Sequence, residues 1–354
     1  MLQPWLKVVV LTAIWCLIIL YFELMRQFSV EDIPGIVRTR PFDWMLACSA
    51  AAVGGLAIGI PYGVSDLLFD ATGLRRRPYW VILLVKGSVQ FLITAAAGAA
   101  MAAVGTLILQ PGDTVVHRAH TMALSGTALM LLVTSLVVSF GINFFQLMQA
   151  MIGPRVLRNL LLGRYHQPRE EERVFMFLDM RASTSHAERL GNVRYSSLVQ
   201  DCFSDLTETI RAHQVEVYQY VGDEAVLTWP LRAGLAHQNC VSAYFHFVGT
   251  LHTRSDHYRQ RYGFVPEFKA GISLGTVTVA EVGIIKREIA YHGDVLNTAA
   301  RIQAQCNALG QPFLISEDVA RHLGPTAAFA LELVGELALR GKSRPVRLYG
   351  VASG

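Results

Sequence analysis

The sequence contains few cysteines and little charge for its length. Two of the five cysteines among its 354 residues, Cys16 and Cys48, lie in apolar runs, and Cys202, Cys240 and Cys306 are far apart. None of them belongs to a C-x-x-C pair, so the spacing excludes a zinc motif and a disulfide framework and predicts buried, reduced thiols. Charged residues make up only 16% of the chain, and the net charge of +4 is scattered. No basic stripe with interleaved aromatic residues is present, which argues against a nucleic-acid partner.

The charge that is present lies mostly in the second half of the chain. Residues 1–150 hold nine Lys/Arg and seven Asp/Glu, and the remainder holds 22 and 20. Four apolar stretches, at about 5–25, 44–64, 79–109 and 121–149, are long enough to cross a bilayer as helices. The sequence therefore excludes a wholly soluble enzyme and predicts a multi-span α-helical membrane domain over 1–150. The first stretch has no strong basic flank and no cleavage site before Glu23, so we interpret it as a retained anchor.

Positive residues next to the spans predict the topology. Arg75, Arg76 and Arg77 lie between spans two and three, and further arginines follow span four at 155, 158 and 164. Both groups of arginines are expected on the cytoplasmic side. The two assignments are consistent, because the groups are separated by two spans and so lie on the same side of the membrane. Arginines at 26, 38 and 40 follow span one, on the opposite side in this topology, and slightly weaken the asymmetry of positive charge on which the prediction rests. The expected location is the cell's inner (plasma) membrane, with a cytoplasmic N-terminus and a cytoplasmic second half.

Three ionisable residues of the membrane half are candidates for a functional role. Lys86 lies well inside span three, about two turns from Arg77, and we expect its side chain to reach the cytoplasmic interface. His117 and His120 lie just beyond the outer end of that span and are expected to be solvated loop residues. Small residues over 95–100 suit close helix packing within a bundle or between subunits. No recognisable ligand motif indicates which signal this half would sense.

A short linker is predicted between the two halves, over 151–170. Pro154 begins a stretch in which Val156, Leu157, Leu160 and Leu161 share one face at helical spacing, ending near Gly163. Such an amphipathic helix suits a juxtamembrane coupler, although a plain linker helix has the same pattern.

The remaining residues, 171–354, alternate between strand and helix patterns. A buried strand ends at Asp179, a helix follows over 184–212, and two strands flank a turn at Gly222-Asp223. A second helix over 233–261, a β segment over 268–283 with a glycine turn, a helix over 294–307 and the strand FLIS complete the series. The order strand–helix–strand–strand–helix–strand predicts an α+β, ferredoxin-like sheet with helices on one face.

Two aspartates lie at strand ends that this sheet makes neighbours. Asp179 closes the first strand, and Asp223 lies in the hairpin turn of the next two. Paired carboxylates suit hard divalent cations such as Mg²⁺, which also take phosphate oxygens from a substrate. Two such ions would activate a hydroxyl and neutralise a leaving pyrophosphate. Either aspartate alone could equally well be a turn or helix-capping residue instead of a metal ligand. The occurrence of both aspartates at neighbouring strand ends rarely arises by accident.

Three further patterns suit a nucleotide triphosphate. Backbone N–H groups around Ser183 and Thr184 lie at a helix N-terminus, where phosphates bind well. Asn297 and Arg301 are four residues apart, so they share a helix face from which they would orient a ribose and stabilise a transferring phosphoryl group. In the basic turn LRGKSRP, Arg340 and Lys342 would bind terminal phosphates, unless the turn is only solvated.

Taken together, these segments resemble the class III nucleotidyl cyclases. The resemblance covers about residues 171–351 and rests on ordered motifs: FLDMRAST, LGN, YQYVGDE, KAGISLGTV, HGDVLNTAAR and LRGKSRPVRLYG. It implies that Asp179 and Asp223 bind two Mg²⁺ or Mn²⁺ ions and that Asn297 and Arg301 stabilise the transition state. It also implies that Arg340 stands where the family has a triphosphate-binding lysine. Finally, it implies a homodimer whose sites lie at the interface, with the metals from one protomer and Asn/Arg from the other.

The purine-reading pair departs from the family pattern. Gln219 stands where adenylate cyclases typically have lysine, and Ala290 where they have aspartate or threonine; the guanylate-type Glu/Cys pair is absent too. Glutamine both donates and accepts hydrogen bonds and so suits either purine, whereas alanine reads neither. We therefore expect a membrane-anchored homodimeric adenylate cyclase that makes cyclic AMP and pyrophosphate from ATP and is regulated through its membrane half. A guanylate cyclase and a catalytically inactive cyclase-like receptor remain the alternatives.

Overall fold

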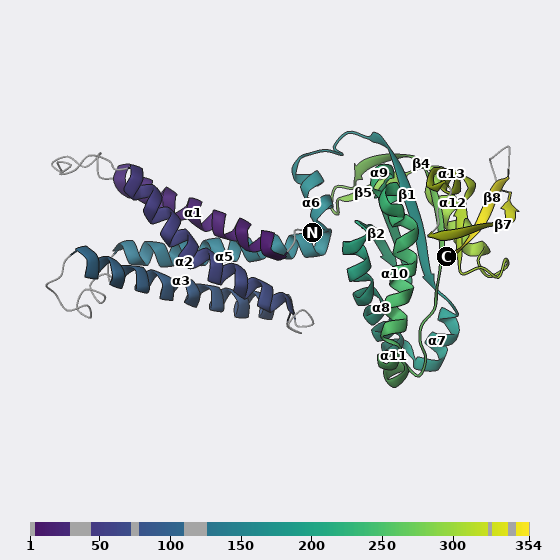
Figure 1. The fold of residues 1–354 in the computed structure, drawn as a ribbon, viewed down its shortest axis with the longest axis horizontal. Coiled ribbons are helices and arrows are strands. Elements are labelled where there is room, and N and C mark those ends of the chain that lie inside the picture. The colour runs from purple at the N-terminus through teal and green to yellow at the C-terminus, as the bar shows by residue number, and fades with distance from the viewer. Residues whose placement is uncertain are drawn as a thin grey trace. The chain divides into compact units, whose positions relative to one another are not determined.

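The computed structural model describes residues 4–28, 44–71, 78–109, 126–324, 328–338 and 345–353. Arg75, Arg76, Arg77, His117 and His120 lie outside these residues, so the expectations about them stay predictions. The chain divides into two compact units, residues 1–152 and residues 153–354, each described by itself below (Figure 1).

The first unit consists of long apolar helices. These are α1 (Pro4–Phe28), α2 (Trp44–Ala71), α3 (Tyr79–Leu109) and α5 (Gly126–Ile152). Each contains a segment long and apolar enough to cross a membrane, namely Trp5–Met25, Ala47–Phe69, Tyr79–Ala100 and Leu132–Ile152. The four predicted spans therefore correspond to four such helices among the described residues.

The closest helix packing lies between α1 and α2 rather than on the small residues of α3. A Cβ atom at Gly55 would lie 2.2 Å from the Sγ atom of Cys16, and one at Gly59 would lie 2.5 Å from the Cα atom of Thr12. In the small-residue stretch of α3, Ala97 packs against the core formed by α1 and α2, but no heavy atom of another segment lies within 4 Å of the Cβ position at Gly98. Glycines spaced by four thus let α2 approach the backbone of α1, as small residues do in membrane bundles.

Lys86 does not extend to an interface, which corrects the expectation from the sequence. It is 7% exposed, forms an ion pair with Asp66 of α2, and donates a hydrogen bond to Gln146 Oε1 of α5 (2.8 Å). Asp66 is fully buried and also pairs with Lys7 of α1. Among the described residues of this unit, Lys7, Asp66, Lys86 and Gln146 thus form a cluster of charged and polar side chains to which α1, α2, α3 and α5 each contribute, because a charge inside an apolar bundle is stable only with partners.

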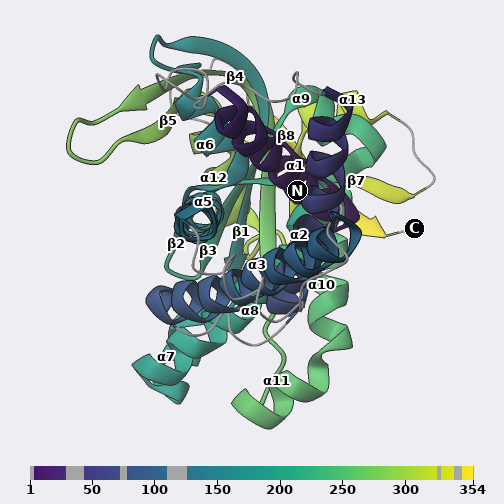
Figure 2. The same ribbon diagram turned by 90° about the vertical axis from the view of Figure 1, so that its left-hand side faces the viewer.

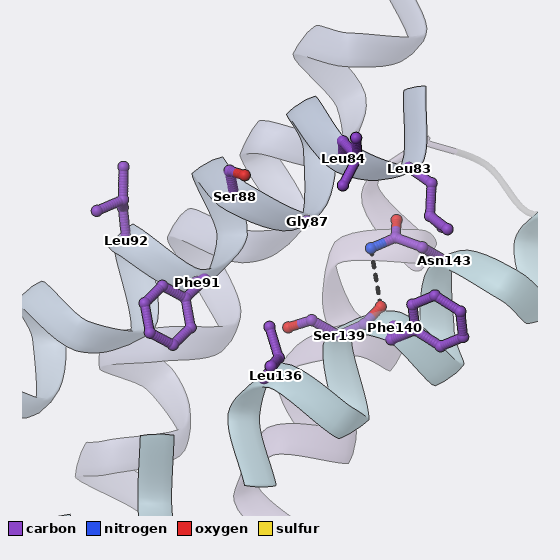
Figure 3. A pocket seen from close by; sticks show the side chains of 10 residues that line it. All are labelled: Leu83, Leu84, Gly87, Ser88, Phe91, Leu92, Leu136, Ser139, Phe140 and Asn143. Atoms are coloured by element: carbon purple, nitrogen blue, oxygen red, sulfur yellow. Dashed lines mark hydrogen bonds between the residues drawn. The ribbon is translucent and has the colours of Figure 1, made fainter. Parts of the chain in front are cut away.

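Uncharged polar side chains continue from this cluster along the inner faces of α3 and α5. Asn143 Nδ2 donates to Gln90 Oε1 (2.6 Å) and to the Ser139 carbonyl oxygen (2.8 Å), and all three residues are buried. Ser139 and Asn143, together with Ser88, also border an otherwise apolar groove of about 350 Å³ between α3 and α5 (Figure 3).

Removing the charge of Asp66 is expected to destabilise the bundle. Asp66→Asn removes the carboxylate that pairs with the buried Lys86 ammonium, and breaking a buried pair in this way typically costs about 3–5 kcal/mol. Thr94→Val is the matched control, because the Thr94 hydroxyl is buried but bonds only the Gln90 carbonyl oxygen of its own helix. In detergent, the melting temperature of the full-length protein should fall clearly further for Asp66→Asn than for Thr94→Val. Equal shifts would contradict the role of the cluster.

The second unit begins with helix α6 (Pro154–Leu161) and is built on one mixed sheet. Its strands are β1 (Arg169–Met180), β2 (Glu216–Val221), β3 (Glu224–Pro230), β4 (Phe268–Val282), β5 (Glu288–His292), β6 (Phe313–Ser316), β7 (Phe329–Leu337) and β8 (Val346–Ser353). The strand order is β2-β3-β1-β4-β6-β8-β7, and β5 pairs with β4. The first four positions are the ferredoxin-like arrangement that the sequence predicts.

Helices cover both faces of this sheet. They are α7 (Ser183–Leu190), α8 (Asn192–Ala212), α9 (Leu231–Leu235), the 3₁₀ turn η2 (Ala236–Gln238), α10 (Asn239–Thr253), α11 (Ser255–Tyr262), α12 (Asp294–Gln305) and α13 (Glu317–Leu323). Val174 and Met176 of β1 pack in one core with α8 and α10, whereas Phe175 packs in another with Val295 and Ala299 of α12. The two helices of the predicted six-element order, α8 and α10, therefore share one face as expected, whereas α12, which follows these elements, packs on the other face. Alternate residues of a strand point to opposite faces, and both faces of β1 are apolar.

Two glycines shape the part of the sheet that bears α12. A Cβ atom at Gly271 of β4 would lie 2.2 Å from the backbone nitrogen of Gln303, so only glycine lets α12 approach the strand this closely. The glycine turn expected in the segment 268–283 lies at its end, where Gly283 has a φ of 90°. From there β4 and β5 form a hairpin that projects from the sheet (Figure 2).

Candidate functional site

Asp179 and Asp223 lie close together at one edge of the sheet. Asp179 is opposite Glu224 in the β1–β3 ladder, and Asp223 precedes Glu224 in the turn whose Gly222 has a φ of 61°. Gln303 Nε2 of α12 donates to Asp179 Oδ2 (2.8 Å), and Lys269 Nζ of β4 lies 3.4 Å from the same oxygen. The predicted hairpin turn and the neighbouring carboxylates are both present.

The electrostatics of this edge suit a divalent cation. Burial, followed by the nearby Asp223 carboxylate, raises the pKa of Asp179. Burial and both aspartates raise the pKa of Glu224 to about 7. Asp223 Oδ2 is buried and has no hydrogen-bond partner among the described residues. An unpartnered buried carboxylate oxygen beside two further carboxylates fits a cation, which would replace the missing hydrogen bonds.

Glu224 is the acidic neighbour that sequence reasoning did not select. Its position directly after Asp223 was visible, but its place opposite Asp179 depends on the register of the β1–β3 ladder. Nowhere in the described part of the chain are three or more His, Cys, Asp or Glu side chains arranged to hold a metal ion by themselves. A cation here would therefore take its other ligands from water or substrate, as Mg²⁺ commonly does.

Tyr195 links Asp223 to the start of α7. Its hydroxyl lies near Ser183 and Asp223, and burial together with Asp223 raises its pKa to about 12. Ser183 is the first residue of α7, and the residue before it, Ala182, has a left-handed φ of 53° and provides no side-chain cap. Ser183 is thus brought to the aspartates, while Thr184 beside it is exposed.

Asn297 and Arg301 lie on the exposed face of α12. Thr298, Ala299 and Ile302 of the same helix are buried toward the sheet. Gln303, which contacts Asp179, is two residues after Arg301 and therefore about 200° around the helix. The structure accordingly does not bring Asn297 and Arg301 to the aspartates of their own chain.

The other predicted site residues are only partly described. Gln219 is exposed on β2, opposite Val226 and after a β-bulge, and Ala290 pairs with Ala280 in the β4–β5 hairpin. Arg340 and Lys342 lie outside the described residues.

Comparison with known proteins identifies the family. Residues 165–352 match the model of the adenylate and guanylate cyclase catalytic domain, a segment that includes every predicted site residue. The chain belongs to this family. The class III resemblance inferred from the motifs is therefore confirmed.

Individual relatives agree with this assignment. Adenylate cyclase 2 of Rhizobium meliloti is 34% identical over 243 residues, which cover 67% of each chain. Guanylate cyclase 2G of Rattus norvegicus is 24% identical over 56% of this chain, but the match covers only 18% of that much longer protein. A bacterial light-regulated adenylyl cyclase has a similar fold, with a TM-score of 0.54 and 19% identity over 65% of this chain and 67% of that one.

Proposed function

We propose that this protein is a membrane-anchored adenylate cyclase that converts ATP to 3′,5′-cyclic AMP and pyrophosphate as a homodimer. The observation that carries the proposal is the pair Asp179 and Asp223, with its unpartnered carboxylate oxygen, on a domain of the cyclase family. Adenylate activity is favoured over guanylate activity because the relative that matches two thirds of this chain at 34% identity is named an adenylate cyclase.

In this proposal Asp179 and Asp223 would hold two Mg²⁺ or Mn²⁺ ions. Bound there, the ions would supply Lewis-acid activation of the ribose 3′-hydroxyl and charge neutralisation on the phosphates. Lys269 and Gln303 keep the Asp179 carboxylate in place. Ser183, Thr184 and the first N–H groups of α7 bind phosphate oxygens, and Arg340 and Lys342 bind the terminal phosphates. The 3′-hydroxyl would release its proton to water, its oxygen would bond to the α-phosphorus while the bond from the α-phosphorus to the oxygen bridging to the β-phosphate breaks, and pyrophosphate would leave.

The site would be completed across a dimer. Asn297 and Arg301 point away from the aspartates of their own chain, so they are available to orient the ribose and stabilise phosphoryl charge in a partner's site. The tip of the β4–β5 hairpin exposes Ile284 and Ile285 fully. Exposed apolar side chains of this kind favour burial against a second copy of the chain.

The proposed location is the inner (plasma) membrane, with the catalytic domain in the cytoplasm. It is supported by four helices of spanning length and by the arginines that follow the fourth span. Helix α6 is proposed to carry regulation, because Val156 and Leu160 pack in the same core as Val295 and Ala299 of α12, the helix that bears Asn297 and Arg301.

A nucleotide assay tests the proposal. Purified full-length protein with Mn²⁺ is expected to form cyclic AMP from ATP faster than cyclic GMP from GTP. Dominant cyclic GMP would favour the guanylate alternative, which Gln219 and Ala290 keep open. No product from either nucleotide would favour the inactive receptor, although every expected catalytic position holds a usable side chain.

Divalent metal is expected to stabilise the protein in a pH-dependent way. The pKa of Glu224 is raised from about 4.5 to about 7 in the folded state, and the pKa of Asp179 is raised as well, so the folded protein holds a proton on Glu224 that the unfolded chain releases within that window. Without metal, this contribution to stability is therefore lost as the pH rises through that window. Mn²⁺ should raise the melting temperature more at about pH 7.5 than at about pH 5. Equal shifts at both pH values, or an undiminished shift in Asp223→Asn, would contradict the metal assignment.

A further inference from the structure

The two strands that carry the purine-reading positions are not joined by backbone hydrogen bonds. Gln219 lies on β2, which pairs with β3, and Ala290 lies on β5, which pairs with β4. In the sheet order β3 and β1 separate β2 from β4. The backbone links Gln219 to Ala290 only through the intervening strands β3, β1 and β4, so direct side-chain packing between β2 and β5 also sets the distance between the two positions.

Aromatic side chains next to the two positions form this packing. Tyr218 precedes Gln219 and Tyr291 follows Ala290, and their rings meet edge to face with centroids 5.0 Å apart. Phe175 of β1 contacts the Tyr291 ring in the same way, at 5.3 Å. All three rings belong to the core on the α12 face of the sheet.

A single buried guanidinium holds these strands together. Arg173 of β1 is 2% exposed, and its guanidinium lies 4.9 Å from the centroid of the Tyr291 ring on β5. It also forms an ion pair with Glu216 of β2 and donates through Nε to Thr228 Oγ1 of β3 (3.2 Å). Its remaining contact is with Glu171 Oε2 of its own strand (2.9 Å). The planar, multivalent donor set of arginine makes all these contacts at once, which a lysine ammonium cannot do.

We propose that Arg173 is a positioning residue for purine selection, fixing the separation of Gln219 and Ala290 through Glu216 and Tyr291. This inference rests on the proposed nucleotide cyclase function. Arg173 does not touch the substrate; it acts through the strands on either side of the purine. Loss of its contacts is therefore expected to change which base is accepted, and how tightly, more than the rate of the chemical step.

The test measures kcat and KM for ATP and GTP with full-length Arg173→Met and Arg173→Lys. For Arg173→Met we expect the ratio of the two kcat/KM values to change by about tenfold, mainly through KM, a size typical of lost pocket contacts. Arg173→Lys keeps the charge beside Glu216 and loses the planar contact with Tyr291, so an intermediate change is expected. Tyr218→Leu, which leaves the ion pairs intact, should shift the same ratio and serves if Arg173→Met does not fold.

Arg254→Met is the matched control. Arg254, between α10 and α11, pairs with the largely buried Asp205 of α8 and so joins helices rather than the strands β2 and β5; its loss therefore reports general destabilisation. We expect its nucleotide ratio to equal that of the wild type. If the ratio in folded Arg173→Met and Tyr218→Leu also equals that of the wild type, the positioning role is overturned while the cyclase function stands. A wild-type chain that converts neither nucleotide would overturn the proposed function, and this inference with it.

Discussion

Asp179→Ala and Asp223→Ala are each expected to abolish cyclic nucleotide formation, lowering kcat by about a thousandfold or more, which corresponds to roughly 4 kcal/mol of barrier. Each substitution removes a proposed metal ligand rather than a core contact. Asp223 Oδ2 has no hydrogen-bond partner among the described residues, so its loss breaks little internal structure. The measurement is product formation by purified full-length variants over a range of Mn²⁺ concentrations.

Removing the charge of Asp223 by Asp223→Asn should not destabilise the fold. The Asp223 carboxylate contributes to the raised pKa values of Asp179 and Glu224, so Asp223→Asn relieves repulsion among ionised groups at neutral pH. Without metal, we expect the variant to melt at the wild-type temperature or above. Asp256→Ala is the control for folding and activity, because Asp256 is exposed on α11. Full activity in either Asp179→Ala or Asp223→Ala would rule out the two-metal assignment.

Co-expression of two inactive variants is expected to restore activity. If Asp179 and Arg301 serve one site from different protomers, a heterodimer of Asp179→Ala with Arg301→Ala keeps one intact site of its two. Random pairing makes about half of the dimers mixed, so about a quarter of the wild-type activity should return. Differently tagged chains purified in tandem would isolate the heterodimer for the assay.

The matched control pairs Asp179→Ala with Asp223→Ala. Both aspartates come from the same protomer in the proposed arrangement, so every site of this heterodimer lacks a metal ligand. It should stay inactive. Absence of recovery in the first pair, with heterodimers demonstrated, would place Arg301 and the aspartates in one chain and contradict the orientation of α12 described above.

Features that depend on local pattern were predictable from the sequence. Apolar length predicted four spanning helices, since about 20 residues of helix cross a bilayer whatever the neighbouring helices do. The turn at Gly222-Asp223 followed from turn chemistry and the strand ending at Asp179 from a short apolar run, and the resemblance of the motifs to the cyclase family is confirmed by the family match. The roles of the individual site residues stay predictions.

Other features were decided only by tertiary structure, because they join residues that no local pattern connects. Lys86 looked like a solitary charge until the bundle placed Asp66 and Lys7 beside it. Glu224 joins Asp179 through strand register, and Gln303 reaches Asp179 because Gly271 lets α12 approach β4. Nothing in the sequence distinguished Arg173 from any other residue at the start of a strand. In the structure it is buried and contacts three other strands, β2, β3 and β5. A charge can be buried only where distant segments supply its partners, and those partners are set by packing rather than by sequence spacing.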